Sequence, residues 1–214
     1  RELAIRIMED DAGRAIDLLE RAFRTGNDCD LLADLKPLLL SLNKRAIQLA
    51  DDQVISRDPK RASDLAALIK DNDKTLAAGL YERAMAAGET RYAANNLANL
   101  IAAEEPERAR GLYEQAIRAG DEYYAPRNLA LLVIADDPDR AVDLLEIAAK
   151  SGNKGNLCAD LEPAIKEGNL KAVGLYEREI VGDDEKRAND LANLIKAIMP
   201  EKVEGLYRRA IAAG

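Results

Sequence analysis

The sequence predicts an all-α fold, an α-solenoid of about seven stacked helix pairs. Three observations support this prediction. A short phrase recurs along the chain at a nearly constant spacing, apolar residues recur at helical spacing within each repeat, and single glycines mark the expected helix ends. A fixed period of roughly 20 to 50 residues indicates an array that grows by adding units, and not one globular core.

The repeated phrase is clearest in the middle of the chain, where it reads Gly111-Leu112-Tyr113-Glu114. We call its leucine the key leucine of each repeat. The key leucines are Leu18, Leu49, Leu80, Leu112, Leu144, Leu175 and Leu206, so consecutive copies are 31 or 32 residues apart. The chain is also rich in alanine, leucine, glutamate, lysine and arginine, which are the strongest helix formers.

Each repeat is expected to contain two helices, and residues 91–120 show this most clearly. Leu97, Leu100 and Ile101 form one apolar stripe of a first helix over residues 92–103. Pro106 suits the first turn of a second helix, which runs to about residue 119. A glycine follows the second helix in most repeats, where it can adopt the left-handed conformation that ends a helix. These glycines are Gly26, Gly88, Gly120, Gly152, Gly182 and Gly214.

The sequence also has a longer period of 126 residues, which spans four of the short repeats. Residues 1–88 align with residues 127–214 at this spacing without a gap. The chain is therefore interpreted as a single helical-repeat array over residues 1–214 in which a block of four units is duplicated. Pro37 and Pro163 occupy equivalent first helices and are expected to kink or restart them. The distance from the key leucine to the leucine of the next first helix falls from 17 to 16 residues after Leu49 and after Leu175. Neither end carries a polar capping repeat, so we expect a fragment of a longer array.

Composition argues against several classes of partner. The formal net charge is −8, which disfavours nucleic acid because phosphate contacts dominate that affinity. No apolar run approaches the roughly 18–20 residues of a membrane span, so no membrane partner is expected. Cys29 and Cys158 are the two cysteines and occupy non-equivalent positions, which favours buried thiols in a reducing compartment, the cytoplasm, over a disulfide framework.

The residue types that most chemistry requires are missing, so the sequence predicts no enzyme, no cofactor and no metal. There is no histidine, the commonest general base and metal ligand. Paired carboxylates such as Glu104-Glu105 lie at turns that lead into helices, where acids complement the helix dipole. The glycines are single and form no phosphate-binding loop.

The repeat resembles the tetratricopeptide repeat, and most closely its Sel1-like branch. The residues that carry this resemblance are Asn96-Leu97-Ala98, the segment from Glu107 to Gly120, and Asn128-Leu129-Ala130. The unit is shorter than the tetratricopeptide unit of about 34 residues, and it lacks the glycine-rich segment between the helices of Sel1-like units. The resemblance implies a right-handed superhelix of antiparallel helix pairs whose first helices line a concave groove that binds peptides or protein surfaces.

By the same resemblance, certain first-helix positions face the groove. Amide and guanidinium groups there could bond a peptide backbone or a carboxylate, and tyrosines could pack against an apolar anchor, although a merely solvated face is the alternative. The candidate partner-binding residues are Tyr92, Asn95, Asn99, Tyr124, Arg127, Leu131, Lys186, Asn189 and Asn193.

We call Leu35, Leu65, Leu97, Leu129, Leu161 and Leu191 the motif leucines of the first helices. The residue before each is aspartate or asparagine: Asp34, Asp64, Asn96, Asn128, Asp160 and Asp190. The partial repeat at the start of the chain has Glu2 there. Such a recurrence fits a repeated structural bond, for example to the backbone of a neighbouring helix. A ladder of ligand-facing side chains is the alternative, and the sequence leaves both open.

The functional prediction is a non-catalytic helical-repeat scaffold that binds a peptide or protein partner in its groove. The alternative is a structural or regulatory repeat segment of a larger multidomain protein, which would position another domain and bind little itself.

Overall fold

The computed structural model describes residues 1–25, 30–154, 156–181 and 185–212, and leaves the side chains of residues 185, 186 and 209–212 undescribed. All regular elements of these described residues are helices. The residues form two compact units, unit 1 over Arg1–Ala103 and unit 2 over Glu104–Gly214. Each unit is considered by itself below.

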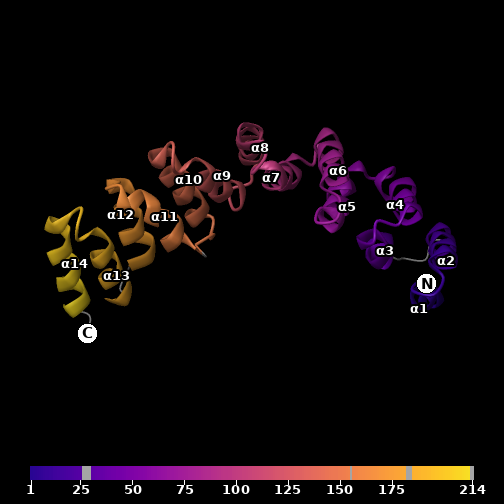
Figure 1. Cartoon of the computed structure of the whole chain (residues 1–214), viewed down its shortest axis with the longest axis horizontal. Coiled ribbons are helices and arrows are strands. Elements are labelled where there is room, and N and C mark those ends of the chain that lie inside the picture. Colours follow the sequence, from indigo (N-terminus) through magenta and orange to yellow (C-terminus); the bar gives the residue numbers. More distant parts are fainter. Residues whose placement is uncertain (26–29, 155, 182–184, 213–214) are drawn as a thin grey trace. The chain divides into compact units, whose positions relative to one another are not determined.

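Unit 1 is coloured from indigo to magenta in Figure 1. Its elements are α1 (Glu2–Ile7), α2 (Ala12–Arg24), α3 (Leu31–Leu40), α4 (Lys44–Ala50), the π-helical turn η1 (Asp51–Ile55), the 3-10 turn η2 (Pro59–Arg61), α5 (Ala62–Ile69), α6 (Lys74–Ala86) and α7 (Thr90–Ile101). It contains four first helices of repeats (α1, α3, α5 and α7) and three second helices (α2, α4 and α6).

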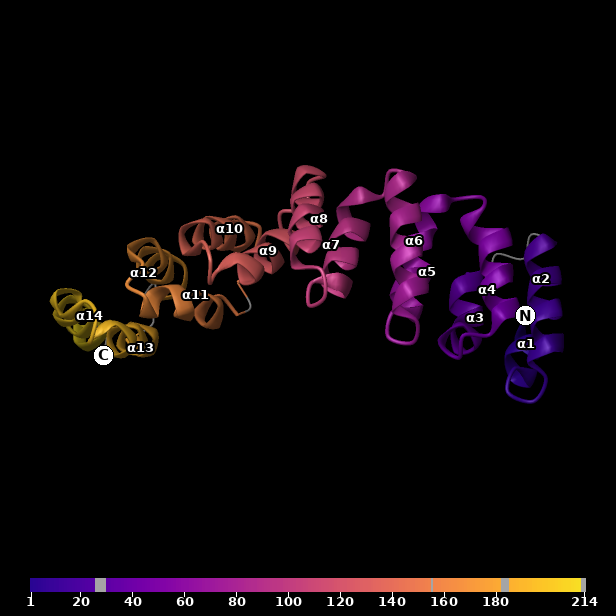
Figure 2. The same ribbon diagram turned by 45° about the horizontal axis from the view of Figure 1, so that its top comes forward.

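Unit 2 continues the alternation, and its helices follow one another in chain order in both views (Figures 1 and 2). Its elements are α8 (Pro106–Arg118), α9 (Ala125–Val133), α10 (Pro138–Lys150), α11 (Leu157–Lys166), α12 (Leu170–Tyr176), the π-helical turn η3 (Glu177–Val181), α13 (Glu185–Ile195) and α14 (Pro200–Ala212).

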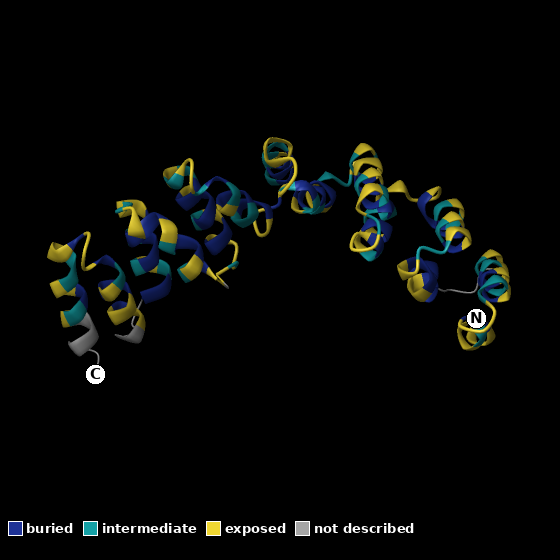
Figure 3. Cartoon of the chain, viewed as in Figure 1, coloured by how far each residue is buried: buried dark blue, intermediate teal, exposed yellow. Residues whose placement is uncertain are grey.

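Helices that are neighbours in sequence pack against each other throughout both units. In unit 1, α6 packs against α5 and α7, and in unit 2, α9 packs against α8 and α10. Contacts also join alternate helices, such as α3 with α5, α2 with α4 and α10 with α12. First helices therefore adjoin first helices, and second helices adjoin second helices. The buried residues, dark blue in Figure 3, lie where the helices face one another.

The repeated phrase lies in the core. Six of the seven key leucines are buried, and Leu18 is half-buried. The tyrosines that follow three of them, Tyr81, Tyr113 and Tyr176, are buried as well. The phrase is therefore a packing motif of the second helices.

Helix ends are specified by the polar and glycine residues around them. Asp11, Asn43, Asp73, Asp137 and Asn169 each accept a backbone hydrogen bond at the start of a second helix. At the other end, the predicted left-handed glycines are confirmed at the three positions that are described, Gly88, Gly120 and Gly152, with φ of 92°, 92° and 99°. Gly26, Gly182 and Gly214 lie outside the described residues.

The prolines inside first helices do not restart them. Pro37 lies within α3 and Pro163 within α11, and each helix continues for three residues beyond its proline. The expected restart is therefore not observed at either position. The turn after the proline is closed by hydrogen bonds to its carbonyl, from Ser41 N at 3.2 Å and from Glu167 N at 3.3 Å.

The shortened second and sixth repeats share a π-helical turn. It covers Asp51–Ile55 in one and Glu177–Val181 in the other, which are 126 residues apart. In the first copy, the Ser56 amide donates to the Asp51 carbonyl five residues earlier at 2.9 Å, and the Ser56 hydroxyl donates to the same oxygen. In both repeats, the second helix therefore ends in a π-helical turn, which is wider than an α-helical turn.

Ion pairs connect successive second helices within each unit. Each pair joins residues about one repeat apart, and most are well exposed, so each contributes little to stability. The pairs are Arg45–Asp17, Arg83–Asp51, Arg140–Glu114, Lys171–Asp143 and Arg178–Glu146.

Two glycines of one helix should respond oppositely to substitution by alanine. Gly111 lies inside α8 with no atom near its missing Cβ, so Gly111→Ala should raise the free energy of unfolding by about 0.5–1 kcal/mol through helix propensity. Gly120 has equally open space but a φ of +92°, so Gly120→Ala should lower it by about 1–2 kcal/mol. Urea denaturation followed by circular dichroism measures both. A loss of stability in Gly111→Ala would contradict the packing described for α8.

Candidate functional site

Arg127, one of the predicted ligand-facing residues, is engaged in an ion pair between two first helices. Its Nε lies 2.5 Å from Asp160 Oδ2 and its Nη2 lies 3.0 Å from Asp160 Oδ1. Asp160 is buried and Arg127 is half-buried. The hydrogen bond that the guanidinium donates to Asp160 raises the pKa of Arg127 and keeps it cationic. The guanidinium therefore joins α9 to α11, and its part in ligand binding stays a prediction.

The same pairing occurs 126 residues earlier. Arg1 Nη2 lies 2.7 Å from Asp34 Oδ1, and this links the start of α1 to α3. The aspartate before the motif leucine thus has a structural role in these two repeats. Its partner is an arginine side chain, and not the backbone of a neighbouring helix given as the example in the sequence analysis. In the second repeat, Asp64 instead accepts from Arg61 in the preceding turn at 3.0 Å.

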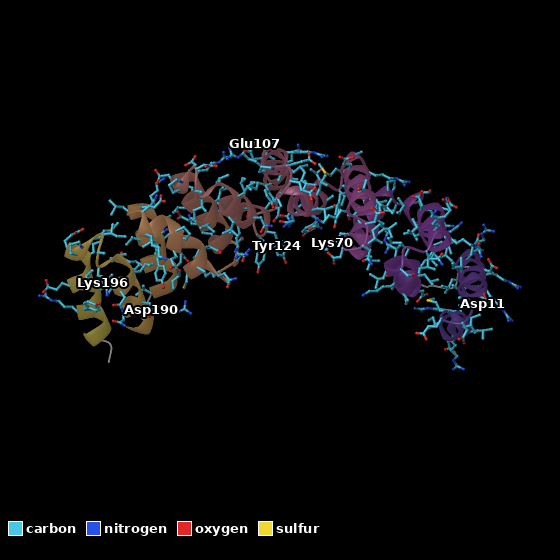
Figure 4. The ribbon with its side chains drawn as sticks, viewed as in Figure 1. Asp11, Lys70, Glu107, Tyr124, Asp190 and Lys196 are labelled. Carbon is cyan, nitrogen blue, oxygen red and sulfur yellow. The ribbon has the colours of Figure 1, made fainter. Side chains whose placement is uncertain are left out.

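Exposed aromatic rings gather at the start of α9. Tyr124 is 52% exposed and points away from the ribbon in Figure 4. The ring of Tyr123 meets it edge to face, with 4.6 Å between the ring centroids and an interplanar angle of 71°. Leu131, seven residues along the same helix, is also exposed and lies on the same side. We refer to Tyr123, Tyr124 and Leu131 as the α9 face.

A buried carboxylate holds the two tyrosines in place. Asp121 is fully buried, and its Oδ1 accepts from the amides of Tyr123 at 3.1 Å and Tyr124 at 2.9 Å. Its Oδ2 accepts from the amide of Ala125 at 3.2 Å. Three amide donors at a helix start offset the cost of burying this charge. On the other side, Asn153 Nδ2 donates to the Tyr123 carbonyl at 2.6 Å. The α9 face is therefore presented by a rigid loop.

The remaining predicted residues of unit 2 lie on α13. Asn189 and Asn193 are exposed, and Asn193 Oδ1 accepts a hydrogen bond from the Tyr207 hydroxyl at 3.2 Å. Lys186 lies within α13, but its side chain is outside the described part of the chain. The two asparagines thus lie on an exposed helix surface, and their part in binding stays a prediction.

In unit 1, the three predicted residues of α7 are in different environments. Tyr92 is exposed, with the guanidinium carbon of Arg91 5.0 Å from its ring centroid. Asn99 is exposed as well. Asn95 is only 5% exposed, because the packed face of α7 also includes Ala93, Ala94 and Ala98 and is wider than one apolar stripe. The expectation that Asn95 faces an open groove is therefore corrected: its side chain is part of the packed surface.

A small cavity of about 210 Å³ opens between α5, α6 and α7, beside Asn99. Its lining includes Lys70, Asp71, Lys74, Tyr81, Asn99 and Leu100. Lys70, labelled in Figure 4, is exposed at the end of α5. Burial, with a contribution from Asp71, raises the pKa of Tyr81 to about 12, so its hydroxyl stays protonated at neutral pH. The cavity combines two cations and one carboxylate with neutral hydrogen-bonding groups.

Within the described residues, no group of three or more Cys, Asp or Glu side chains is placed to hold a metal ion. None of the helices described is both long enough and apolar enough to cross a membrane. No protein-family model, curated protein or solved structure matches the chain. The site must therefore be interpreted from its own geometry.

The loop residues before α9 and two residues of α6 that belong to the site are not identified from the sequence. Tyr123 was not selected, and neither were Asp121, Lys74 or Tyr81. A signal for Asp121 was present, because a polar residue follows each C-terminal glycine: Glu89 after Gly88, Asp121 after Gly120 and Asn153 after Gly152. Glu89 accepts backbone hydrogen bonds at the start of α7 in the same way as Asp121 does before α9.

The Arg127–Asp160 pair should stabilise the fold more than an exposed pair of the same type. Arg127→Ala would leave a buried carboxylate without its cation and should lower the free energy of unfolding by roughly 1–3 kcal/mol. Arg45→Ala, which breaks the exposed pair with Asp17, should cost less than about 1 kcal/mol. Urea denaturation of the two variants and of Asp160→Ala makes the comparison. Equal small losses would show that the buried pair contributes no more than the exposed one.

Stability should fall at alkaline pH because buried phenols must ionise when the chain unfolds. Burial raises the pKa of Tyr81 and of Tyr113 from 10.0 to about 12 in the folded chain. Their contribution is complete below pH 10 and is lost as the pH rises towards 12. Urea midpoints measured across this window should decline, and less steeply in Tyr81→Phe. Identical pH profiles for the wild type and Tyr81→Phe would contradict this origin of the decline.

Proposed function

We propose that the chain is a non-catalytic helical-repeat scaffold, similar to tetratricopeptide arrays, that binds a peptide or protein segment on the exposed surface of its first helices. The helix pairs would continue as a right-handed solenoid. The observation that carries the proposal is the α9 face, where two tyrosines and a leucine are exposed together at the start and on one side of a single first helix.

Three properties of the α9 face support binding over simple solvation. Tyrosines supply large contact areas at low conformational cost, and they are enriched among residues that dominate binding energy. The edge-to-face geometry and the Asp121 hydrogen bonds hold the rings before a partner arrives, so little entropy is lost on binding. The partly accessible Arg127 guanidinium and the α13 amides offer polar groups in the same unit.

The chemistry of the partner follows from these groups. A peptide with a bulky apolar residue would place it against Tyr123, Tyr124 and Leu131, and its backbone could bond to Asn189 or Asn193. In unit 1, the cavity beside Asn99 would accept a small acidic or amide group near Lys70. Because the chain carries a net charge of −8, a partner that is neutral or basic overall is favoured.

The alternative, a repeat segment that positions other domains of a larger protein, is supported by a different observation. Ion pairs join successive second helices on the surface opposite the one proposed for binding, and they would limit the motion of one repeat against the next. A spacer of this type needs stiffness and no exposed aromatic anchor, so the α9 face favours the binding proposal.

The test is selection of peptides from a random displayed library on the immobilised chain, followed by affinity measurement with labelled peptides. Tyr124→Ala and Leu131→Ala should each weaken the selected peptides about tenfold or more, which is roughly 1.4 kcal/mol. The matched control is Ile147→Ala, which removes an equally exposed apolar side chain from the second helix α10.

Thermal unfolding of the three variants should stay close to that of the wild type, because the side chains are exposed. Selection that enriches no peptide, or peptides whose affinity is unchanged in both first-helix variants, would refute the assignment of this face.

A further inference from the structure

Two tyrosines at equivalent positions of the repeat differ in what covers their rings. Tyr92 at the start of α7 and Tyr124 at the start of α9 each lie five residues before the motif leucine, and both are exposed. The residue before Tyr92 is Arg91, and its guanidinium carbon lies 5.0 Å from the centroid of the Tyr92 ring. The residue before Tyr124 is Tyr123, and among the described residues no cation lies over either of these two rings. The chain thus supplies a cation to one tyrosine and leaves the equivalent pair without one.

The two tyrosines before α9 present ring faces that suit a guanidinium group. The faces of aromatic rings carry partial negative charge, and arginine stacks on them more often than lysine does. The rings of Tyr123 and Tyr124 are inclined at 71°, so their faces point in different directions. Asp121 accepts from the backbone amides of both residues and thereby fixes the loop that carries the rings. A planar cation can therefore lie over one ring while its alkyl stem contacts the other.

The charge beside these rings is negative. Glu122, directly before Tyr123, is exposed, and its carboxylate forms no ion pair within the part of the chain that the structure describes. Its backbone is held by the Ser151 hydroxyl, which donates to the Glu122 carbonyl at 2.7 Å. Arg127, on the same helix, is already paired with Asp160. Because the whole chain also carries a net charge of −8, the rings lie in a field that attracts a cation.

We infer that the α9 face binds an arginine side chain of its partner, with the guanidinium over the tyrosine rings and Glu122 as its counter-charge. The inference rests on the proposed function and defines its peptide further, because Leu131 then contacts the apolar residue and the tyrosines contact the arginine. Tyr124 and Leu131 are seven residues apart on one helix, which is about 10 Å at 1.5 Å per residue. An extended peptide rises about 3.3 Å per residue, so its arginine and its apolar residue should be about three positions apart.

The first experiment changes the peptide and leaves the chain intact. Peptides that the immobilised chain selects from a random library should carry an arginine about three positions from a bulky apolar residue. Replacing that arginine by citrulline, a neutral residue of nearly the same shape, should weaken binding about tenfold, because a stacked and paired cation is lost. Replacement by lysine should weaken binding about threefold, since an ammonium group is more strongly hydrated and cannot stack as a plane.

The second experiment changes the chain. Tyr124→Phe keeps the aromatic face and should bind the arginine peptide within about twofold of the wild type, whereas Tyr124→Leu keeps only apolar bulk and should bind about threefold more weakly or worse. Glu122→Gln should weaken the arginine peptide about threefold at low salt, less at high salt, and the citrulline peptide not at all. The matched control is Asp136→Asn, which removes an exposed carboxylate just beyond the other end of α9 and should leave both affinities unchanged.

The outcomes separate this inference from the proposed function. Selected peptides that Leu131→Ala weakens but that show no preference for arginine would overturn the inference and leave the proposed function standing. Equal affinity for the arginine and citrulline peptides, or equal affinity of Tyr124→Phe and Tyr124→Leu for the arginine peptide, would overturn it as well. Selection that enriches no peptide would overturn both.

Discussion

The close approach of helices at one small residue is the constraint on which the rest of the structure depends. The alanine three residues before the key leucine is fully buried in all six copies where it occurs: Ala15, Ala46, Ala77, Ala109, Ala141 and Ala172. The motif leucine is also buried in the six first helices α3, α5, α7, α9, α11 and α13. A larger side chain at such a position forces neighbouring backbones apart, and each repeat passes the displacement to the next. The period of the sequence is therefore a packing requirement repeated once for each unit.

Charged groups act within this packed framework and do not replace it. Most ion pairs between repeats are exposed and individually weak, whereas the buried carboxylates Asp121 and Asp160 each satisfy their oxygens with several donors. The partnered aspartates fix geometry: one orients the loop before α9, and the other aligns α9 with α11. In the N-terminal copy the pairing is less complete, because Asp34 bonds Arg1 through one oxygen and its buried Oδ2 has no partner.

The two helix types thus have different roles, and this is why we propose that the first helices bind the partner. The second helices bury the repeated phrase and use their outer surface for ion pairs that link the repeats. The first helices bury one stripe and leave polar amides and the α9 face open.

The sequence by itself determined the helix class, the repeat boundaries and the residues that end the helices. Period, apolar stripes and left-handed glycines are local properties, so they can be recognised without knowing the partners of each helix. It also predicted that Tyr92, Asn99, Tyr124, Leu131, Asn189 and Asn193 would be accessible, because these positions lie off the apolar stripe. Their part in binding stays a prediction.

Only the tertiary structure decided how the polar positions are used. Arg127 and Asn95 share a position in their repeats, yet one joins two helices and the other is packed into α7, because neighbouring helices differ in what they place opposite. Leu42 adopts a left-handed φ of 54° at the position where the second copy has Gly168, with a φ of 82°. The turn between packed helices requires that conformation, and the surrounding contacts impose it on a residue that would avoid it in an isolated chain.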